Sequence, residues 1–169
     1  MTETPATLTY TYLFSRYSVR IYLNISALNG LDILSCDIQN TYLNADFREA
    51  ICDHTGQEFG SKAGPIMILR KTLYGLKFSG AVFCAHLAET LHAIGFLSTE
   101  ADPDVCYLNA VKPNDFEYYE YVLCYVYNIL CISHDLDIEL GQIQAIFKFK
   151  RDKIEQPKIY LGDKVRNMI

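Results

Sequence analysis

The sequence predicts an α+β fold in which helices pack on one face of an antiparallel sheet. Segments whose apolar residues recur at helical spacing alternate with short apolar or aromatic segments that are typical of strands. The order along the chain is helix, strand, two strands, helix, three strands, helix and strand, which fits this architecture. With 169 residues, 50% of them hydrophobic and 21% charged, the chain is long enough for one domain with a substantial core.

The first half of the chain supplies one helix and three strands. Residues 18–29 carry apolar side chains at helical intervals, and Asn29 with Gly30 provides a left-handed stop. The segment LDILSCDIQN that follows is predicted to be a buried strand ending near Asp37. After a compact turn, REAICDH and GPIMILRK are predicted to be two strands that pair as a hairpin around a polar loop.

The second half begins with the clearest helix of the chain. Ser79 is a suitable cap, Gly95 ends the helix, and the apolar face comprises Phe83, Leu87, Leu91 and Ile94. Three strands are then predicted at DVCYLNA, FEYYEYVLCYV and NILCIS, with the turn KPND between the first two. A helical pattern returns in HDLDIELGQIQAIFKF, and KIYLGDKV is predicted to be a last strand.

Composition and charge exclude several classes of protein. The formal net charge of −5 argues against a chain that holds nucleic acid by overall electrostatics, because phosphate binding depends on clustered Lys and Arg. The six cysteines form no C-x-x-C pair and have no His at zinc-finger spacing, so they are predicted to be reduced and mostly buried thiols.

The sequence predicts neither secretion nor membrane insertion. The segment MTETPATLTYTY has neither the basic nor the apolar region of a secretory signal. The longest apolar run, Tyr121 to Ile132, has about 12 residues, whereas a spanning helix needs about 20. We therefore expect an intracellular protein, cytoplasmic or nuclear, without a membrane partner, and we make no prediction of its oligomeric state.

Three segments in order carry a more specific pattern. They are LDILSCDIQNTYLNADFRE, RKTLYGLKFSGAVF and YEYVLCYVYNILCISHD, at residues 31–49, 70–83 and 119–135. Together they resemble the palm of the reverse transcriptase of copia-type retrotransposons, an RNA-directed DNA polymerase. The flanking pieces GF, DPDV and YLG fit the same family, so the resemblance covers nearly the whole chain.

The resemblance assigns roles to individual positions. Asp37 stands in the place of the carboxylate that holds the catalytic magnesium ions, and Tyr42 in the place of the aromatic residue beneath the incoming sugar. Gly75 and Lys77 belong to the family's Leu-Tyr-Gly-Leu-Lys segment, which lies beside the nucleotide and the template. The resemblance therefore implies nucleotide-binding positions at Tyr42, Gly75 and Lys77 and a metal-binding position at Asp37.

The sequence departs from the family at the carboxylates that bind the catalytic metal ions. Polymerases use two metal ions about 3.5 to 4 Å apart, and magnesium prefers carboxylate oxygens as ligands. In this chain Tyr127 and Asn128 replace both aspartates of the family's Tyr-Val-Asp-Asp hairpin. Tyrosine is neutral at pH 7, and the Asn carbonyl oxygen is a poorer magnesium ligand than a carboxylate. Asp37 is therefore the one retained carboxylate of three.

Neighbouring carboxylates are not expected to replace the lost pair. Asp135 and Asp137 follow Asn128 by seven residues or more, which places them about 20 Å away along a strand. Asp32 precedes Asp37 by five residues and faces the opposite side of the strand. Because each loss of about 1.4 kcal/mol of transition-state stabilisation costs tenfold in rate, we expect polymerase activity to be lost.

The resemblance also sets expectations for the whole chain. Residues 1–169 are expected to form a single palm domain that lacks most of the fingers, the thumb and the RNase H domain. Mg²⁺ is the family's cofactor, and we expect no productive binding of it here. Binding of a primer-template is expected to be weak or lost. The alternative is a non-catalytic interaction module or a weak nucleic-acid-binding fragment.

Overall fold

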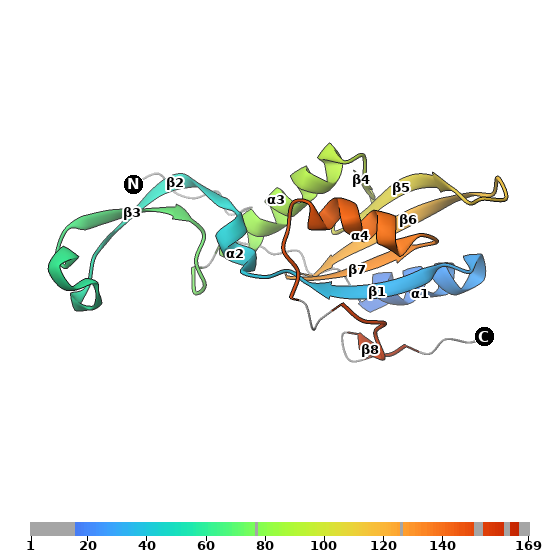
Figure 1. Cartoon of the computed structure of the whole chain (residues 1–169), viewed down its shortest axis with the longest axis horizontal. Coiled ribbons are helices and arrows are strands. Elements are labelled where there is room, and N and C mark those ends of the chain that lie inside the picture. Colours follow the sequence, from blue (N-terminus) through green and yellow to red (C-terminus); the bar gives the residue numbers. More distant parts are fainter. Residues whose placement is uncertain (1–15, 77, 126, 151–153, 161–162, 166–169) are drawn as a thin grey trace.

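Five of the described strands form one antiparallel sheet (Figure 1). The structure is a computed structural model, and it describes residues 16–76, 78–125, 127–150, 154–160 and 163–165. In chain order the strands of the sheet are β1 (Asp32–Asp37), β4 (Leu97–Ser98), β5 (Val105–Val111), β6 (Glu117–Tyr125) and β7 (Asn128–Ser133). Their spatial order is β1-β7-β6-β5-β4, so β7 and β6 lie in the centre of the sheet.

Strand β7 is buried on both faces of the sheet. Ile129 and Cys131 point toward one face and Leu130 and Ile132 toward the other, and all four side chains are fully buried. A strand that is covered on both faces has a continuous apolar sequence rather than an alternating one. This explains why NILCIS has no polar residue in its interior.

Two helices cover one face of the sheet. They are α3 (Ser79–Ala93) and α4 (Leu136–Gln144), and their apolar residues pack on the strands in a single cluster. Its fully buried members from the helical segments include Phe83, Leu87, Leu91 and Ile143. The predicted α+β class, with helices packed on an antiparallel sheet, is confirmed.

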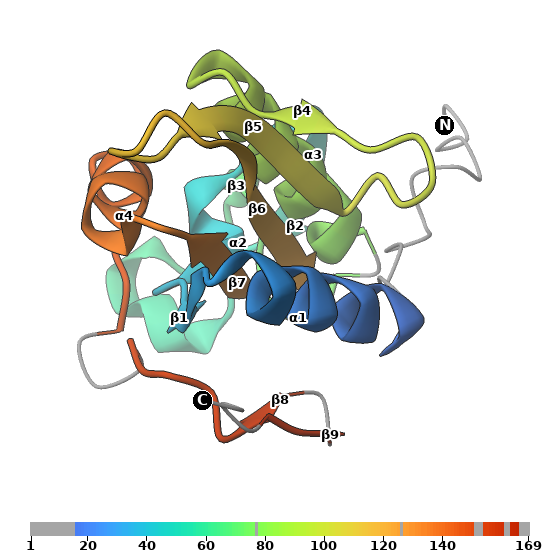
Figure 2. The same cartoon turned by 90° about the vertical axis from the view of Figure 1, so that its right-hand side faces the viewer.

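The opposite face is also covered, by helix α1 (Arg16–Asn29) and by the hairpin of β8 (Ile159–Tyr160) and β9 (Asp163–Lys164) (Figure 2). Val19 of α1 and Tyr160 of β8 are buried in a second cluster against Leu123 and Leu130. The sequence predicted helices on one face only. The reason for the difference is that the central strands carry apolar side chains on both faces of the sheet. Each face is therefore buried by packing against other elements.

A two-stranded ribbon extends away from the sheet (Figure 1). It pairs β2 (Asp46–His54) with β3 (Ile66–Lys71) in antiparallel register, as the sequence predicted. Its loop contains a 3-10 segment, η2 (Gln57–Lys62), and a short helix, α2 (Thr41–Asn44), connects β1 to β2. The ribbon is joined to the body beside the end of β1, where the candidate site lies.

The ends of several elements differ from their predicted positions. Ser79 is the first residue of α3 rather than its cap, and its hydroxyl donates a hydrogen bond to the backbone oxygen of Leu73 at 2.6 Å. Helix α4 ends at Gln144, and Phe149 instead pairs with Ile38 beside β1. The last predicted strand is the short β8–β9 pair, and residues 161–162 between them lie outside the described residues.

The composition predicted the state of the thiols. All six cysteines are free, and Cys36, Cys106, Cys124 and Cys131 are buried in the sheet. The prediction that most of the cysteines are buried is confirmed. Within the part of the chain that the structure describes, no helix is long and apolar enough to span a bilayer.

Helix α4 buries a carboxyl group against the sheet. Glu139 is 1% exposed, and neither oxygen of its carboxyl group has a hydrogen-bond partner among the described residues. Burial raises the pKa of Glu139 well above its usual value, and the nearby Glu120 and Cys36 raise it further. The folded state therefore holds this carboxyl group in its protonated form at a pH where the unfolded chain has lost the proton.

Replacing Glu139 by Gln should flatten the pH dependence of stability. The pKa of Glu139 is 4.5 in the unfolded chain and higher in the folded protein. The contribution of Glu139 to stability is therefore fully present below pH 4.5 and is lost as the pH rises toward the folded pKa. The wild-type free energy of unfolding should lose about 1.4 kcal/mol per pH unit in this range from Glu139 alone. Urea denaturation between pH 4 and 8 measures the slope. The matched variant Glu100→Gln, at an exposed position, should keep the wild-type slope, and an equal slope in Glu139→Gln would contradict the account.

Candidate functional site

The pairing of β1 with β7 brings three of the predicted site residues together. Asp37 is the register partner of Asn128, and the backbone N–H of Ile38 donates to the carbonyl oxygen of Tyr127 at 2.8 Å. Ile38 and Tyr127 are therefore a hydrogen-bonded pair, so Asp37 and Asn128 form the adjacent non-hydrogen-bonded pair. The Cα atoms in such a pair lie about 4.5 Å apart, with their side chains on the same face.

Buried neighbours fix the position of Asp37. Cys36 and Ile38 on either side of it point into the core and are fully buried, and Asp37 itself is 8% exposed. The outer edge of β1 is covered by the segment after α4, because the N–H of Gln39 donates to the oxygen of Lys148 at 2.7 Å and that of Lys150 to the oxygen of Asp37 at 2.9 Å. The carboxylate is thus placed by backbone pairing on both sides.

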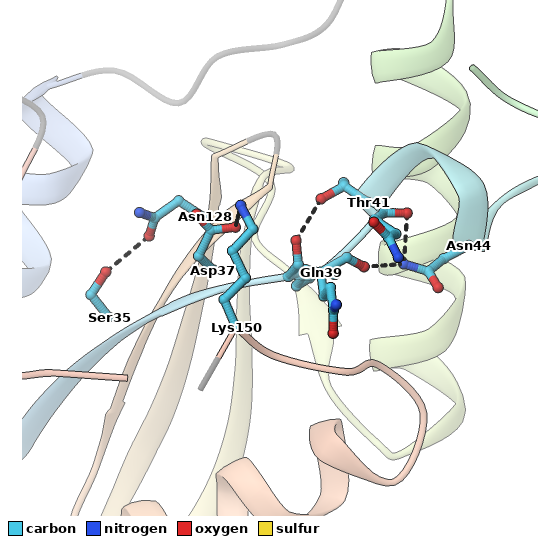
Figure 3. Close-up of polar contacts among 9 residues, drawn as sticks. Ser35, Asp37, Gln39, Thr41, Asn44, Asn128 and Lys150 are labelled. Atoms are coloured by element: carbon cyan, nitrogen blue, oxygen red, sulfur yellow. Dashed lines mark hydrogen bonds and ion pairs between the residues drawn. The ribbon is translucent and has the colours of Figure 1, made fainter. Parts of the chain in front are cut away.

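The carboxylate of Asp37 is already paired with a cation of the same chain (Figure 3). The ammonium of Lys150 lies 2.9 Å from Oδ1 of Asp37 and 5.6 Å from the ring centroid of Tyr127. The hydrogen bond to Asp37 raises the pKa of Lys150, so the lysine stays protonated. Lys150 therefore presents a fixed positive charge between Asp37 and the hairpin.

The amide of Asn128 is engaged in a separate hydrogen bond. Its Oδ1 atom accepts a hydrogen bond from the hydroxyl of Ser35 at 3.0 Å (Figure 3). Ser35 lies two residues before Asp37 on the same face of β1. The oxygen that would have to serve as a metal ligand is thus satisfied within the sheet. The side chain of Tyr127 is 48% exposed and offers a phenol in place of a carboxylate.

Tyr42 lies on α2 beside the end of β1 and is half-buried. Its ring contacts the ring of Tyr74 edge-on, with 4.7 Å between the centroids. Burial raises the pKa of Tyr42, and Tyr74, Cys84 and Tyr127 raise it further. Tyr127 is thus among the groups that influence the pKa of Tyr42.

The segment LYGLK contributes a bend. Gly75 has φ +93°, a conformation that side-chain-bearing residues rarely adopt, and a Cβ added there would meet no atom within 4 Å. The glycine is therefore required by the backbone conformation and not by a close approach of another group. Lys77, the other position predicted in this segment, lies outside the described residues.

The donor set of the described residues does not fit a pair of magnesium ions. Among them, Asp37 is the one carboxylate at the tip, the place where the end of β1 meets Tyr127 and Asn128, and its charge is balanced by Lys150. Asp32 pairs with Ser133 at the far end of β1, and Asp135 caps helix α4 by accepting from the N–H of Ile138. No group of three His, Cys, Asp or Glu residues in the described ranges is arranged to hold a metal ion. Magnesium chemistry has no adequate ligand set at this tip.

Sequence reasoning missed Lys150, Ser35 and Tyr74 as members of the site. Lys150 stands in the basic run KFKRDK, but the predicted helix through Phe149 hid its position beside β1. Ser35 precedes Asp37 by two residues, which places both on one face of a strand, and this spacing was a usable signal. Nothing in the sequence alone indicated that Tyr74 would contact Tyr42.

The fold and the tip define an α+β domain in which a strand-end carboxylate faces a hairpin. No protein-family model matches the sequence. The chain is similar to the retrovirus-related Pol polyprotein from transposon RE1 of Arabidopsis thaliana, with 27% identity over 129 residues. The match covers 75% of this chain and 8% of the polyprotein, so the chain spans a small part of that relative's length. The similarity supports a retrotransposon-derived region.

Replacing Asp37 by Asn should lower the pKa of the Lys150 ammonium. The hydrogen bond to Asp37 is the main cause of its raised pKa, and the neutral amide removes most of that effect. A pH titration of the lysine Cε and Hε resonances by NMR measures the change. The control Asp46→Asn breaks the exposed ion pair with Lys71, 2.7 Å long, and should leave Lys150 unchanged. An unchanged Lys150 pKa in Asp37→Asn would contradict the pairing.

Proposed function

We propose that this chain is the palm region of a copia-type reverse transcriptase that has lost polymerase activity. The observation that carries the proposal is the register of β1 with β7, which sets Asp37 opposite Asn128 at the end of a hairpin. This is the arrangement in which a polymerase would present its carboxylates to two metal ions. In this chain the arrangement is kept while two of the three carboxylates are replaced.

The placement of the other motif segments supports the same proposal. Tyr42 and the LYGLK segment come from parts of the sequence separated by about thirty residues, and Tyr74 of that segment contacts the Tyr42 ring. Tyr127 also influences the pKa of Tyr42. The similarity to a retrotransposon Pol polyprotein covers most of the chain. A single palm domain over residues 1–169 is the simplest organisation consistent with these contacts.

The loss of activity follows from charge. A two-metal centre carries about four positive charges, and carboxylates must offset them. At this tip Asp37 supplies one negative charge, and the ammonium of Lys150 cancels it. A metal ion approaching Asp37 would have to displace the lysine and would then find Tyr127 and the Ser35-bound amide of Asn128 as neighbours. We infer that Mg²⁺ is not bound productively.

The proposal has consequences for nucleic-acid binding and for the location of the protein. Primer-template, the family's nucleic-acid partner, is bound weakly or not at all, because the net charge is −5 and Lys150 is engaged with Asp37. The protein is proposed to act inside the cell, in the cytoplasm or the nucleus. A non-catalytic interaction module is the second candidate function, and an open edge of the sheet at β5 favours it.

A primer-extension assay tests the loss of activity. The wild-type protein with Mg²⁺ or Mn²⁺ should give no templated product above a control without enzyme. The double variant Tyr127→Asp, Asn128→Asp should also give little product, because Lys150 still occupies the carboxylate of Asp37. An active reverse transcriptase in parallel reactions shows that the assay works. Templated extension by the wild-type protein would overturn the proposal.

A further inference from the structure

Within the described part of the chain, one edge of the main sheet is open over about half the length of β5. Strand β4 pairs with β5 only at Tyr107 and Cys106. Among the strands that the structure describes, none pairs with the remaining part of β5, up to Val111, on the side away from β6. The opposite edge differs, because β1 is covered by backbone hydrogen bonds to Lys148, Lys150 and Glu155.

The hydrogen bonds of the β5–β6 pair show which backbone groups face this open edge. The N–H of Lys112 donates to the oxygen of Phe116 at 2.9 Å, so these two residues form a hydrogen-bonded pair. Hydrogen-bonded and non-hydrogen-bonded pairs alternate along an antiparallel ladder. The N–H and C=O groups of Asn109 and Val111 therefore point away from β6. An edge with outward donors and acceptors is a template for an added strand.

A row of tyrosine rings crosses the sheet beside this edge, on the face that carries α1. The ring centroids of Tyr22 and Tyr121 lie 4.8 Å apart, those of Tyr121 and Tyr119 6.3 Å, and those of Tyr119 and Tyr107 5.6 Å. Tyr121, at the inner end of the row, packs on Tyr22 of α1. Tyr119, however, is 48% exposed, so the outer part of the row is open to a ligand.

A cavity of about 420 Å³ adjoins the edge and the tyrosines. Its lining includes Asn109, Val111, Glu117, Tyr119 and Tyr121. Glu117 is the register partner of Val111, which is 62% exposed, so its carboxylate lies on the same face and next to the open edge. No ion pair joins Glu117 to a cation in the described part of the chain.

Lys112, which follows Val111 in the sequence, is engaged elsewhere. The ammonium of Lys112 donates to the backbone oxygen of Asn29 at 2.5 Å, at the C-terminal end of α1, where the helix dipole favours a cation. It also lies 5.7 Å from the ring centroid of Phe116 and 5.6 Å from that of Tyr118. The negative charge of Glu117 is therefore available to bind a cation from a partner, and the same charge would repel a phosphate group.

We propose that an extended, arginine-containing segment of a partner protein adds to the sheet as a strand along Asn109–Val111 of β5. Its backbone pairs with the outward N–H and C=O groups of these two residues. One side chain of such a strand points to the face of α1, and an arginine there stacks on Tyr119 and pairs with Glu117. A planar guanidinium meets both needs, because it stacks on aromatic rings and binds carboxylates through two N–H groups. The inference is independent of the proposed polymerase ancestry.

Two capped peptides test the proposal on the full chain. The first is acetyl-Val-Thr-Arg-Thr-Val-amide, and the second has Gln in place of Arg. In NMR titrations the first should shift the backbone amide resonances of Asn109 and Val111 and bind about fivefold more tightly than the second, as expected for one exposed cation–π and ionic contact. Slower hydrogen exchange of these two amides in the presence of peptide would show that they have become donors to an added strand.

Three variants separate the contributions. Glu117→Gln should abolish the preference for the arginine peptide. Val111→Pro removes an outward N–H while leaving the ladder to β6 intact, so it should weaken both peptides. Tyr17→Ala, at an exposed position of α1, is the matched control and should change neither affinity. The thermal unfolding midpoint of each variant confirms that it is folded.

Several results would overturn the proposal. One is the absence of shifts at Asn109 and Val111 in the folded wild-type protein at millimolar peptide. Equal affinity for the two peptides would remove the role of Glu117, and unchanged binding by a folded Val111→Pro variant would remove the role of the edge. A concentration-dependent dimer that Val111→Pro abolishes, without peptide binding, would show that the occupant of the edge is a second copy of this chain.

Discussion

The antiparallel pairing of β1 with β7 is the constraint on which the rest of the structure depends. Among the described strands, it joins the first in the sequence to the last one of the main sheet, from Asp32 opposite Ser133 to Asp37 opposite Asn128. Because side chains alternate between faces, a slip of β1 by one residue would turn Cys36 away from the cluster that it shares with Ile129. The packing of both cores therefore fixes the register, and the register fixes which residues meet at the tip.

Under the proposed function the geometry of the site persists without its chemistry, and the packing offers a physical explanation. Register is held by Cys36, Ile38 and Ile129, which are fully buried, and by their apolar neighbours, and not by the residues at the tip. Tyr127 and Asn128 are exposed or half-buried, so their replacement removes no core contact. In the present structure Lys150 and Ser35 satisfy the polar groups that a metal centre would otherwise use. The tip can lose its carboxylates while the fold remains intact.

Local patterns predicted most of the fold, because each strand or helix of the core carries its own periodicity. The β2–β3 hairpin, the α3 helix and the three strands from β5 to β7 follow directly from apolar spacing and turn residues. The position of α1 across the sheet from α3 and α4 was not predictable in this way. It depends on the apolar character of both faces of β6 and β7, which appears in the sequence only as a continuous apolar run.

The candidate site was less predictable than the fold. Asp37, Tyr127 and Asn128 meet because strands distant in sequence pair, and the motif order anticipated that meeting. Lys150 reaches Asp37 through backbone pairing of the segment after α4 with β1. The spacing of apolar residues in the sequence does not predict such a contact. The open edge of β5 was equally hidden, since it depends on β4 being only two residues long. Tertiary pairing, and not local propensity, decides these features.

Metal binding by a restored tip tests the central claim most directly. The triple variant Tyr127→Asp, Asn128→Asp, Lys150→Met returns both carboxylates and removes the competing cation. Titration with Mn²⁺ should broaden the amide resonances around Asp37 and the restored residues, and the additional change Asp37→Asn should abolish this broadening. The wild-type protein should show no broadening localised there. A folded triple variant with no localised broadening would contradict the account, because the register of β1 with β7 would then not present a metal site.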